Sequence, residues 1–151
     1  MSDMRRYIEK RREGHPLFGL EPVPPARVAE IRAAYPWIST QYLDFISAVG
    51  VGGCPLMNIY EPVSLQTVSE HPSFMLYQGA AYRSAFGSSS VNREIPKDVV
   101  IIADVGASWS YCLSPDSGLG VLCFDMASCE LLDEAETFFE FIDRDLFPDA
   151  G

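Results

Sequence analysis

The sequence predicts an α+β fold: a single, largely antiparallel sheet flanked by helices, with helices in the N-terminal third and an amphipathic helix at the C-terminus. Short strand-like segments follow one another closely in the second half, while apolar residues recur at helical spacing near both ends. The 151 residues, 48% of them hydrophobic and 21% charged, suffice for one domain with its own core. We therefore expect one domain over residues 1–151, with a helix and a proline-rich connector over 1–24 and the core over 25–147.

Two elements precede the core. Tyr7 and Ile8 follow Met4 at helical spacing and predict a short amphipathic helix that begins at Ser2 and ends near Glu13. The next segment, His15–Pro25, holds four of the eleven prolines and predicts an extended connector.

Two helices are predicted to open the core. Pro25 suits a first helical position, and the helix it begins should end at Tyr35, which precedes a proline. Ser39 is the predicted N-cap of the next helix, which Gly50 ends. The apolar positions of this second helix are Tyr42, Phe45, Ile46 and Val49. Beyond it we expect a tight turn and a short strand over Met57–Tyr60, whereas residues 61–92 have no clear pattern.

Turn residues separate a series of strand-like segments in the second half of the chain. Strands joined by such short turns must pair antiparallel, because a parallel crossover needs a dozen residues or more. The predicted strands are Val99–Ala103, Trp109–Leu113, Leu119–Phe124 and Cys129–Leu132.

The last helix is predicted from its cap and its apolar stripe. Asp133 and Glu136 form an acidic version of the capping box, and the helix must end before Pro148. The stripe, which should cover one face of the sheet, consists of Ala135, Phe138, Phe139, Ile142 and Leu146.

The charge of the chain is strongly negative and unevenly distributed. The formal net charge is −10, and residues 98–151 contain twelve acidic residues and one basic residue, Arg144. A phosphate backbone is bound through lysine and arginine, so this composition argues against nucleic-acid binding and favours a basic protein partner. The alternative is that the carboxylates simply form a solvated surface. Candidate partner-binding residues are Asp104 and Asp116 in turns, Glu136, Glu140 and Asp143 opposite the apolar stripe, and the aromatic residue Trp109.

Motifs for catalysis, metals or membranes are not found in the sequence. The four cysteines have no C-x-x-C spacing and are expected to be reduced, mostly in the core, and we expect neither a metal nor a cofactor. His15 and His71 each precede a proline and belong to no motif. The longest apolar run has five residues, where a membrane span needs about twenty. Since the N-terminus lacks the apolar core of a signal peptide, the expected location is the cytoplasm.

Several blocks of the sequence resemble those of the SUKH superfamily, between about Val28 and Ile142. The segment Ile38–Ile46, followed by Gly50-Val51-Gly52-Gly53, is similar to its helix and Gly-Gly signature. Ile95-Pro96 and the strand from Val99 to Gly106 look like its proline, strand and Ala-x-x-Gly block. Val121–Asp125 and Ala135–Ile142 look like its later blocks.

The resemblance implies an α+β fold and binding without catalysis. The superfamily contains fungal regulators of cell-wall glucan synthesis and bacterial immunity proteins that neutralise toxins, often nucleases, by direct contact. We therefore expect a cytoplasmic immunity protein with one basic toxin as its partner. The alternatives are a regulatory scaffold with several partners and, less favoured, a hydrolase with paired acidic residues, for which Asp125→Asn is the test. The oligomeric state and the identity of the partner are left open.

Overall fold

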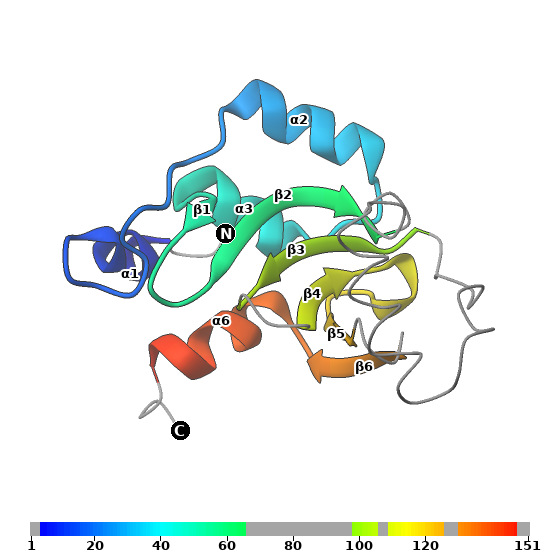
Figure 1. Ribbon diagram of the computed structural model, residues 1–151. Coiled ribbons are helices and arrows are strands. Elements are labelled where there is room, and N and C mark those ends of the chain that lie inside the picture. Colours follow the sequence, from blue (N-terminus) through cyan, green and yellow to red (C-terminus); the bar gives the residue numbers. More distant parts are fainter. Residues whose placement is uncertain (1–3, 66–97, 106–108, 126–129, 148–151) are drawn as a thin grey trace, which may run out of the picture.

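The computed structural model describes residues 4–65, 98–105, 109–125 and 130–147. Within them, six strands form one antiparallel sheet in the order β1-β2-β3-β4-β5-β6. In the described residues, three helices and a 3₁₀ turn precede the first strand, and one helix follows the last strand (Figure 1). The fold is α+β with a single antiparallel sheet, as the sequence predicted.

The first helix is shorter than predicted. It comprises α1 (Arg5–Ile8) and a 3₁₀ turn, η1 (Glu9–Arg11), and Ser2 lies outside the described residues. The chain leaves the helix early because the N–H of Leu17 donates to the carbonyl oxygen of Lys10 at 2.9 Å and draws the buried Leu17 back against this turn.

The next two helices begin and end where the sequence predicted. Helix α2 (Pro25–Ala34) has its proline in the first turn, and the Oγ of Ser39 accepts a hydrogen bond from a first-turn N–H of α3 (Thr40–Ala48) at 3.3 Å. Gly50 follows α3 with φ +125°, and a Cβ there would lie 2.2 Å from the backbone of Glu21. This position therefore requires glycine.

Strands β3, β4 and β5 lie within one or two residues of the predicted ranges, and β2 and β6 are longer than predicted. Strand β1 forms where the sequence predicted only a tight turn, because Gly52 and Gly53 pair with Ile59 and Asn58 of β2. They are β1 (Gly52–Gly53), β2 (Asn58–Ser64), β3 (Val100–Asp104), β4 (Trp109–Leu113), β5 (Val121–Asp125) and β6 (Glu130–Ala135). A 3₁₀ turn, η2 (Pro115–Ser117), joins β4 to β5. Register shifts interrupt the pairs β2–β3, β3–β4 and β5–β6, and such bulges increase the local twist of a sheet.

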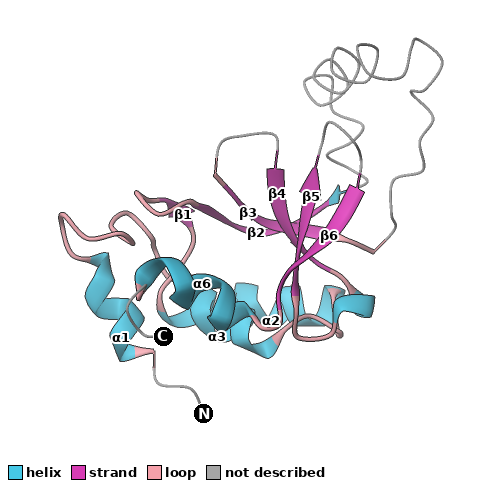
Figure 2. Cartoon of the chain, turned by 90° about the horizontal axis from the view of Figure 1, so that it is seen from below, coloured by secondary structure: helices cyan, strands magenta, loops and turns pink. Residues whose placement is uncertain are grey.

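The helices lie on one side of the sheet (Figure 2). Between them and the sheet lies the main core, in which rings of α3 and α6 (Phe138–Leu146) pack edge to face, Phe45 and Phe138 with their centroids 5.3 Å apart. A second cluster of buried residues contains Val99, Ile101 and Phe124. Strand β3 is buried along nearly its whole length, which explains its continuous apolar run.

The C-terminal helix begins later than predicted. Asp133 belongs to β6, where it pairs with Leu122, and Ala135 still pairs with Val121. The N-cap is Thr137, whose Oγ1 accepts the N–H of Glu140 at 3.1 Å. The predicted capping box of Asp133 and Glu136 was wrong, because pairing with β5 keeps the chain extended as far as Ala135. Of the segment 61–92, for which the sequence predicts no structure, residues 66–92 lie outside the described residues.

Candidate functional site

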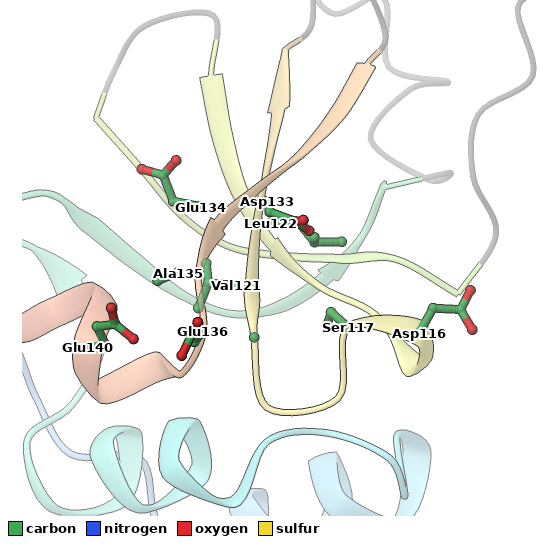
Figure 3. A pocket seen from close by; sticks show the side chains of 10 residues that line it. Asp116, Ser117, Val121, Leu122, Asp133, Glu134, Ala135, Glu136 and Glu140 are labelled. Atoms are coloured by element: carbon green, nitrogen blue, oxygen red, sulfur yellow. The ribbon is translucent and has the colours of Figure 1, made fainter.

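An open cavity of about 530 Å³ lies where the η2 turn, the end of β6 and the start of α6 meet (Figure 3). Its lining, as far as the described residues form it, carries five carboxylates and no basic side chain. The lining residues are Asp116, Ser117, Gly120, Val121, Leu122, Asp133, Glu134, Ala135, Glu136 and Glu140. We call this surface the acidic cavity.

Local structure fixes where the carboxylates of the acidic cavity stand. A capping box between Ser114 and Ser117 holds the η2 turn, and with it Asp116. On the other side, the Thr137 cap sets the start of α6, so that Glu136 precedes the helix and Glu140 lies in its first turn. A carboxylate in the first turn is stabilised by the partial positive charge of the helix N-terminus.

Among the described residues, a cationic partner is found for one of the five carboxylates, Glu134. Arg144 of α6 forms a salt bridge with Glu134 and also donates to the carbonyl oxygen of Glu134 at 3.1 Å. Asp116, Asp133, Glu136 and Glu140 are exposed, and none of these four forms a salt bridge with another described residue. The acidic cavity thus presents uncompensated negative charge to solvent.

The structure brings three of the six predicted binding residues together. Asp116, Glu136 and Glu140 all line the acidic cavity, although they are up to 24 positions apart in the sequence (140 minus 116). Sequence reasoning missed Asp133 and Glu134 as members of this surface. The missing signal was the extra length of β6, which directs Asp133 to the cavity instead of to a helix N-terminus.

Asp143 is half-buried and bonded to side chains of the first helix, whereas its place opposite the apolar stripe predicted that it faces water. Its Oδ1 accepts the hydroxyl of Tyr7 at 2.6 Å, and its Oδ2 accepts the Arg6 guanidinium at 2.8 Å. The Asp143 side chain is 28% exposed. Burial, followed by the contacts with Asp143, raises the pKa of the Tyr7 phenol well above its usual range. Asp143 therefore joins α6 to α1.

Asp104 also has partners within the chain. It accepts hydrogen bonds from the Asn58 amide at 2.9 Å and from the Tyr60 hydroxyl at 2.6 Å, across the β2–β3 pair. Trp109, in contrast, is 51% exposed at the start of β4 and is not among the residues that line the acidic cavity. The candidate residues thus fall into a group at the cavity, two carboxylates with internal bonds, and one separate aromatic side chain.

The thiols behave as core residues where they are described. Cys112 and Cys123 are buried and reduced, Cys54 is half-buried and reduced, and Cys129 lies outside the described residues. Burial raises the pKa of the Cys112 thiol well above its usual range, so this group is a poor nucleophile.

In the described parts of the chain, no three histidine, cysteine, aspartate or glutamate side chains are grouped so as to hold a metal ion. Nor does any helix there have the length and apolar character needed to cross a membrane. His15 is exposed, and His71 lies outside the described ranges.

No protein family, no curated protein and no solved structure matches this chain. The acidic cavity is therefore interpreted from its own geometry and charge.

Proposed function

We propose that this chain is a non-catalytic binding protein of the cytoplasm that neutralises a bacterial toxin by direct contact. The toxin domain it fits is a basic one, such as a nuclease. Two independent lines support this: the resemblance of blocks such as Ile38–Ile46 to the SUKH superfamily, and the charge of the acidic cavity.

The observation that carries the proposal is the concentration of uncompensated carboxylates on one concave surface. Asp116, Asp133, Glu136 and Glu140 stand exposed there without a cation from the described part of the chain. Such a surface attracts a positively charged partner over distance and raises the association rate by factors of roughly 10 to 1,000. It also rejects acidic proteins and nucleic acids.

A nuclease is a suitable partner on physical grounds. Its substrate surface must carry lysine and arginine to bind phosphates. An inhibitor that presents carboxylates to the same side chains would compete directly with the nucleic acid. This mode of inhibition needs no catalytic residue on the inhibitor.

The test has two steps: a search for a toxin domain encoded beside this gene, and then protection of cells from that domain. The unchanged chain should restore growth, and the cavity variant Asp116→Lys/Glu136→Lys should lose most of that protection. The matched control is Glu9→Lys/Glu13→Lys, which changes the net charge equally at exposed positions of the N-terminal segment. This control should protect like the unchanged chain.

Two outcomes would contradict the proposal. If the unchanged chain protects against no neighbouring toxin and affinity purification from its host yields several housekeeping proteins, the regulatory scaffold is the better reading. If the purified chain hydrolyses a glycan or phosphodiester and Asp125→Asn abolishes the turnover, the protein is an enzyme.

A further inference from the structure

The sheet extends beyond the helices that cover it. The start of β4, the end of β5 and the start of β6 project together away from the helix layer (Figure 2). Trp109 begins β4, Asp125 ends β5 and Glu130 begins β6, so these three residues mark the projecting end.

The register of the strands places two rows of side chains on one face of this end. Trp109 pairs with Asp125, which pairs with Glu130. The adjacent row is Tyr111, Cys123 and Leu132. Cross-strand partners share a face, as do residues two apart on one strand. Because the Tyr111 ring packs on Phe141 of α6, with centroids 4.6 Å apart, this is the face toward the helices.

Two large apolar side chains on this face are exposed. Trp109 is 51% exposed and Leu132 is 56% exposed, whereas Cys123, on the strand β5 between them, is 7% exposed. The other tryptophan, Trp37, is half-buried and packs on Tyr35, with centroids 5.9 Å apart. Tryptophan is enriched among the residues that contribute most of the binding energy at protein interfaces.

The charge around these two side chains is negative. Asp125 and the exposed Glu130 stand in the row of Trp109. Burial first, and then the carboxylate of Glu134, raises the pKa of both Tyr111 and Cys123. Asp145 acts on Tyr111 and Asp125 on Cys123 in the same direction. The basic group here, Arg144, lowers both pKa values but forms its salt bridge with Glu134.

The exposed apolar side chains and the negative charge around them together determine which partner this surface can bind. A second copy of the chain would bring Asp125 and Glu130 against the same carboxylates, and like charges that face each other destabilise a pair. An arginine meets both features at once, because its guanidinium stacks on an indole and binds carboxylates through paired hydrogen bonds. An aliphatic side chain next to that arginine would cover Leu132.

We propose that this surface, which we call the Trp109 face and define as Trp109, Asp125, Glu130 and Leu132, binds an arginine of the partner protein that has an aliphatic residue beside it. The inference rests on the proposed function, since it gives the toxin a second contact in addition to the acidic cavity. The cavity attracts the partner by charge, and the Trp109 face supplies the apolar contact that slows its dissociation.

A direct test uses the blocked peptide Leu-Arg-Leu-Arg as the probe and the indole N–H signals of the two tryptophans in NMR. The peptide should shift the Trp109 signal in a saturable way in the millimolar range and leave the Trp37 signal in place. A peptide with citrulline for each arginine should bind at least fivefold more weakly, because citrulline keeps the shape and loses the charge.

Variants locate the binding on the Trp109 face. Glu130→Gln should weaken the arginine peptide about threefold or more, whereas Glu13→Gln, at an exposed position of the N-terminal segment, should leave its affinity unchanged. The inference is overturned if Trp109 does not respond, if the citrulline peptide binds equally well, or if Glu13→Gln weakens the peptide as much as Glu130→Gln does.

Cell protection separates this inference from the function on which it rests. Trp109→Ala, which should keep the unchanged melting temperature because the side chain is exposed, should reduce protection from the toxin at least tenfold. Full protection by this variant would overturn the Trp109 face as a partner contact and leave the proposed function standing. Peptide binding at Trp109 by a chain that protects against no toxin would overturn the proposed function while the arginine site stands.

Discussion

The contact of Tyr7 with Asp143 should be a main stabilising link between α1 and α6, two elements more than 130 residues apart in the chain. The Tyr7 side chain is fully buried, packs edge to face on Phe45, and stacks on Phe139. Its hydroxyl donates to Asp143 at 2.6 Å and accepts from Arg6 at 2.6 Å. Two substitutions remove the link from opposite sides: Tyr7→Phe and Asp143→Ala.

The expected magnitudes follow from which group is left without a partner. A hydrogen bond to a charged group contributes about 1.5–3 kcal/mol. Tyr7→Phe should cost about 1.5–2 kcal/mol, because Asp143 keeps Arg6 and its access to water. Asp143→Ala should cost about 2–3 kcal/mol, since the buried hydroxyl then has no acceptor. The Arg6–Asp143 ion pair adds about 1 kcal/mol or less, because the two side chains are 50% and 28% exposed.

Urea unfolding followed by circular dichroism measures these costs. For a chain of this length, a loss of 2–3 kcal/mol corresponds to a fall in melting temperature of roughly 4–12 °C. The control is Asp145→Ala, which removes an exposed carboxylate from the same helix and should change the free energy of unfolding by less than about 0.5 kcal/mol. The reasoning is refuted if Asp143→Ala is no more destabilising than Asp145→Ala.

A tyrosine, two cysteines and two glycines supply three more tests of the fold. Burial and a hydrogen bond to an aspartate of β3 raise the pKa of Tyr60 to about 12, so its stabilising effect is complete below about pH 10 and is lost as the pH rises to about 12. Ultraviolet titration of Tyr60→Phe should therefore lack one late-ionising phenol. Iodoacetamide should alkylate Cys54 before Cys112, because Cys54 is only half-buried and burial raises the pKa of the Cys112 thiol. Mass spectrometry of the peptides measures the order of alkylation. Gly50→Ala should reduce the free energy of unfolding by more than about 3 kcal/mol through strain and a clash with the backbone, against about 1–2 kcal/mol for Gly14→Ala, where φ is +83° and the space is open.

Each of these tests has a contradicting result. If Tyr60→Phe has as many late-ionising tyrosines as the unchanged chain, the hydroxyl of Tyr60 is not held by its neighbours. The alkylation experiment uses the variant Cys129→Ser. Equal alkylation rates at Cys54 and Cys112 would contradict the burial of β4. Equal stability of Gly50→Ala and Gly14→Ala would contradict the close approach of the chain after α3 to the connector.

Much of the fold could be predicted because local signals and tertiary structure agree. Helix α3 has a cap, Ser39, an apolar stripe and a final glycine, and each has its predicted role. The strands of the second half are separated by turns too short for any pairing other than an antiparallel one. In such segments the local choice and the packed structure favour the same conformation.

The prediction failed at the boundary of β6 and α6 for a physical reason. In isolation, aspartate is a better N-cap than threonine, so the local signal favours Asp133 over Thr137. Pairing with β5, 11 residues earlier at Leu122, decides between them and keeps Asp133 in the strand. Sequence spacing carries no information about that pairing.

The candidate site was predicted in part for the same reason. The concentration of acidic residues in 98–151 is visible in the sequence, and it identified Asp116, Glu136 and Glu140 at the cavity. The fate of Asp143 depends on Tyr7, 136 positions away, and no local pattern reveals such a contact. Helical periodicity alone placed Asp143 with the solvated residues.

The rate at which the chain associates with the basic toxin domain proposed as its partner tests the central claim most directly. Stopped-flow measurement at low and at physiological salt should show a rate that falls steeply with salt, and that is at least tenfold lower for Asp116→Lys/Glu136→Lys than for the matched control Glu9→Lys/Glu13→Lys. A rate that is independent of salt and equal for the two variants would contradict the acidic cavity as the surface that a basic partner meets.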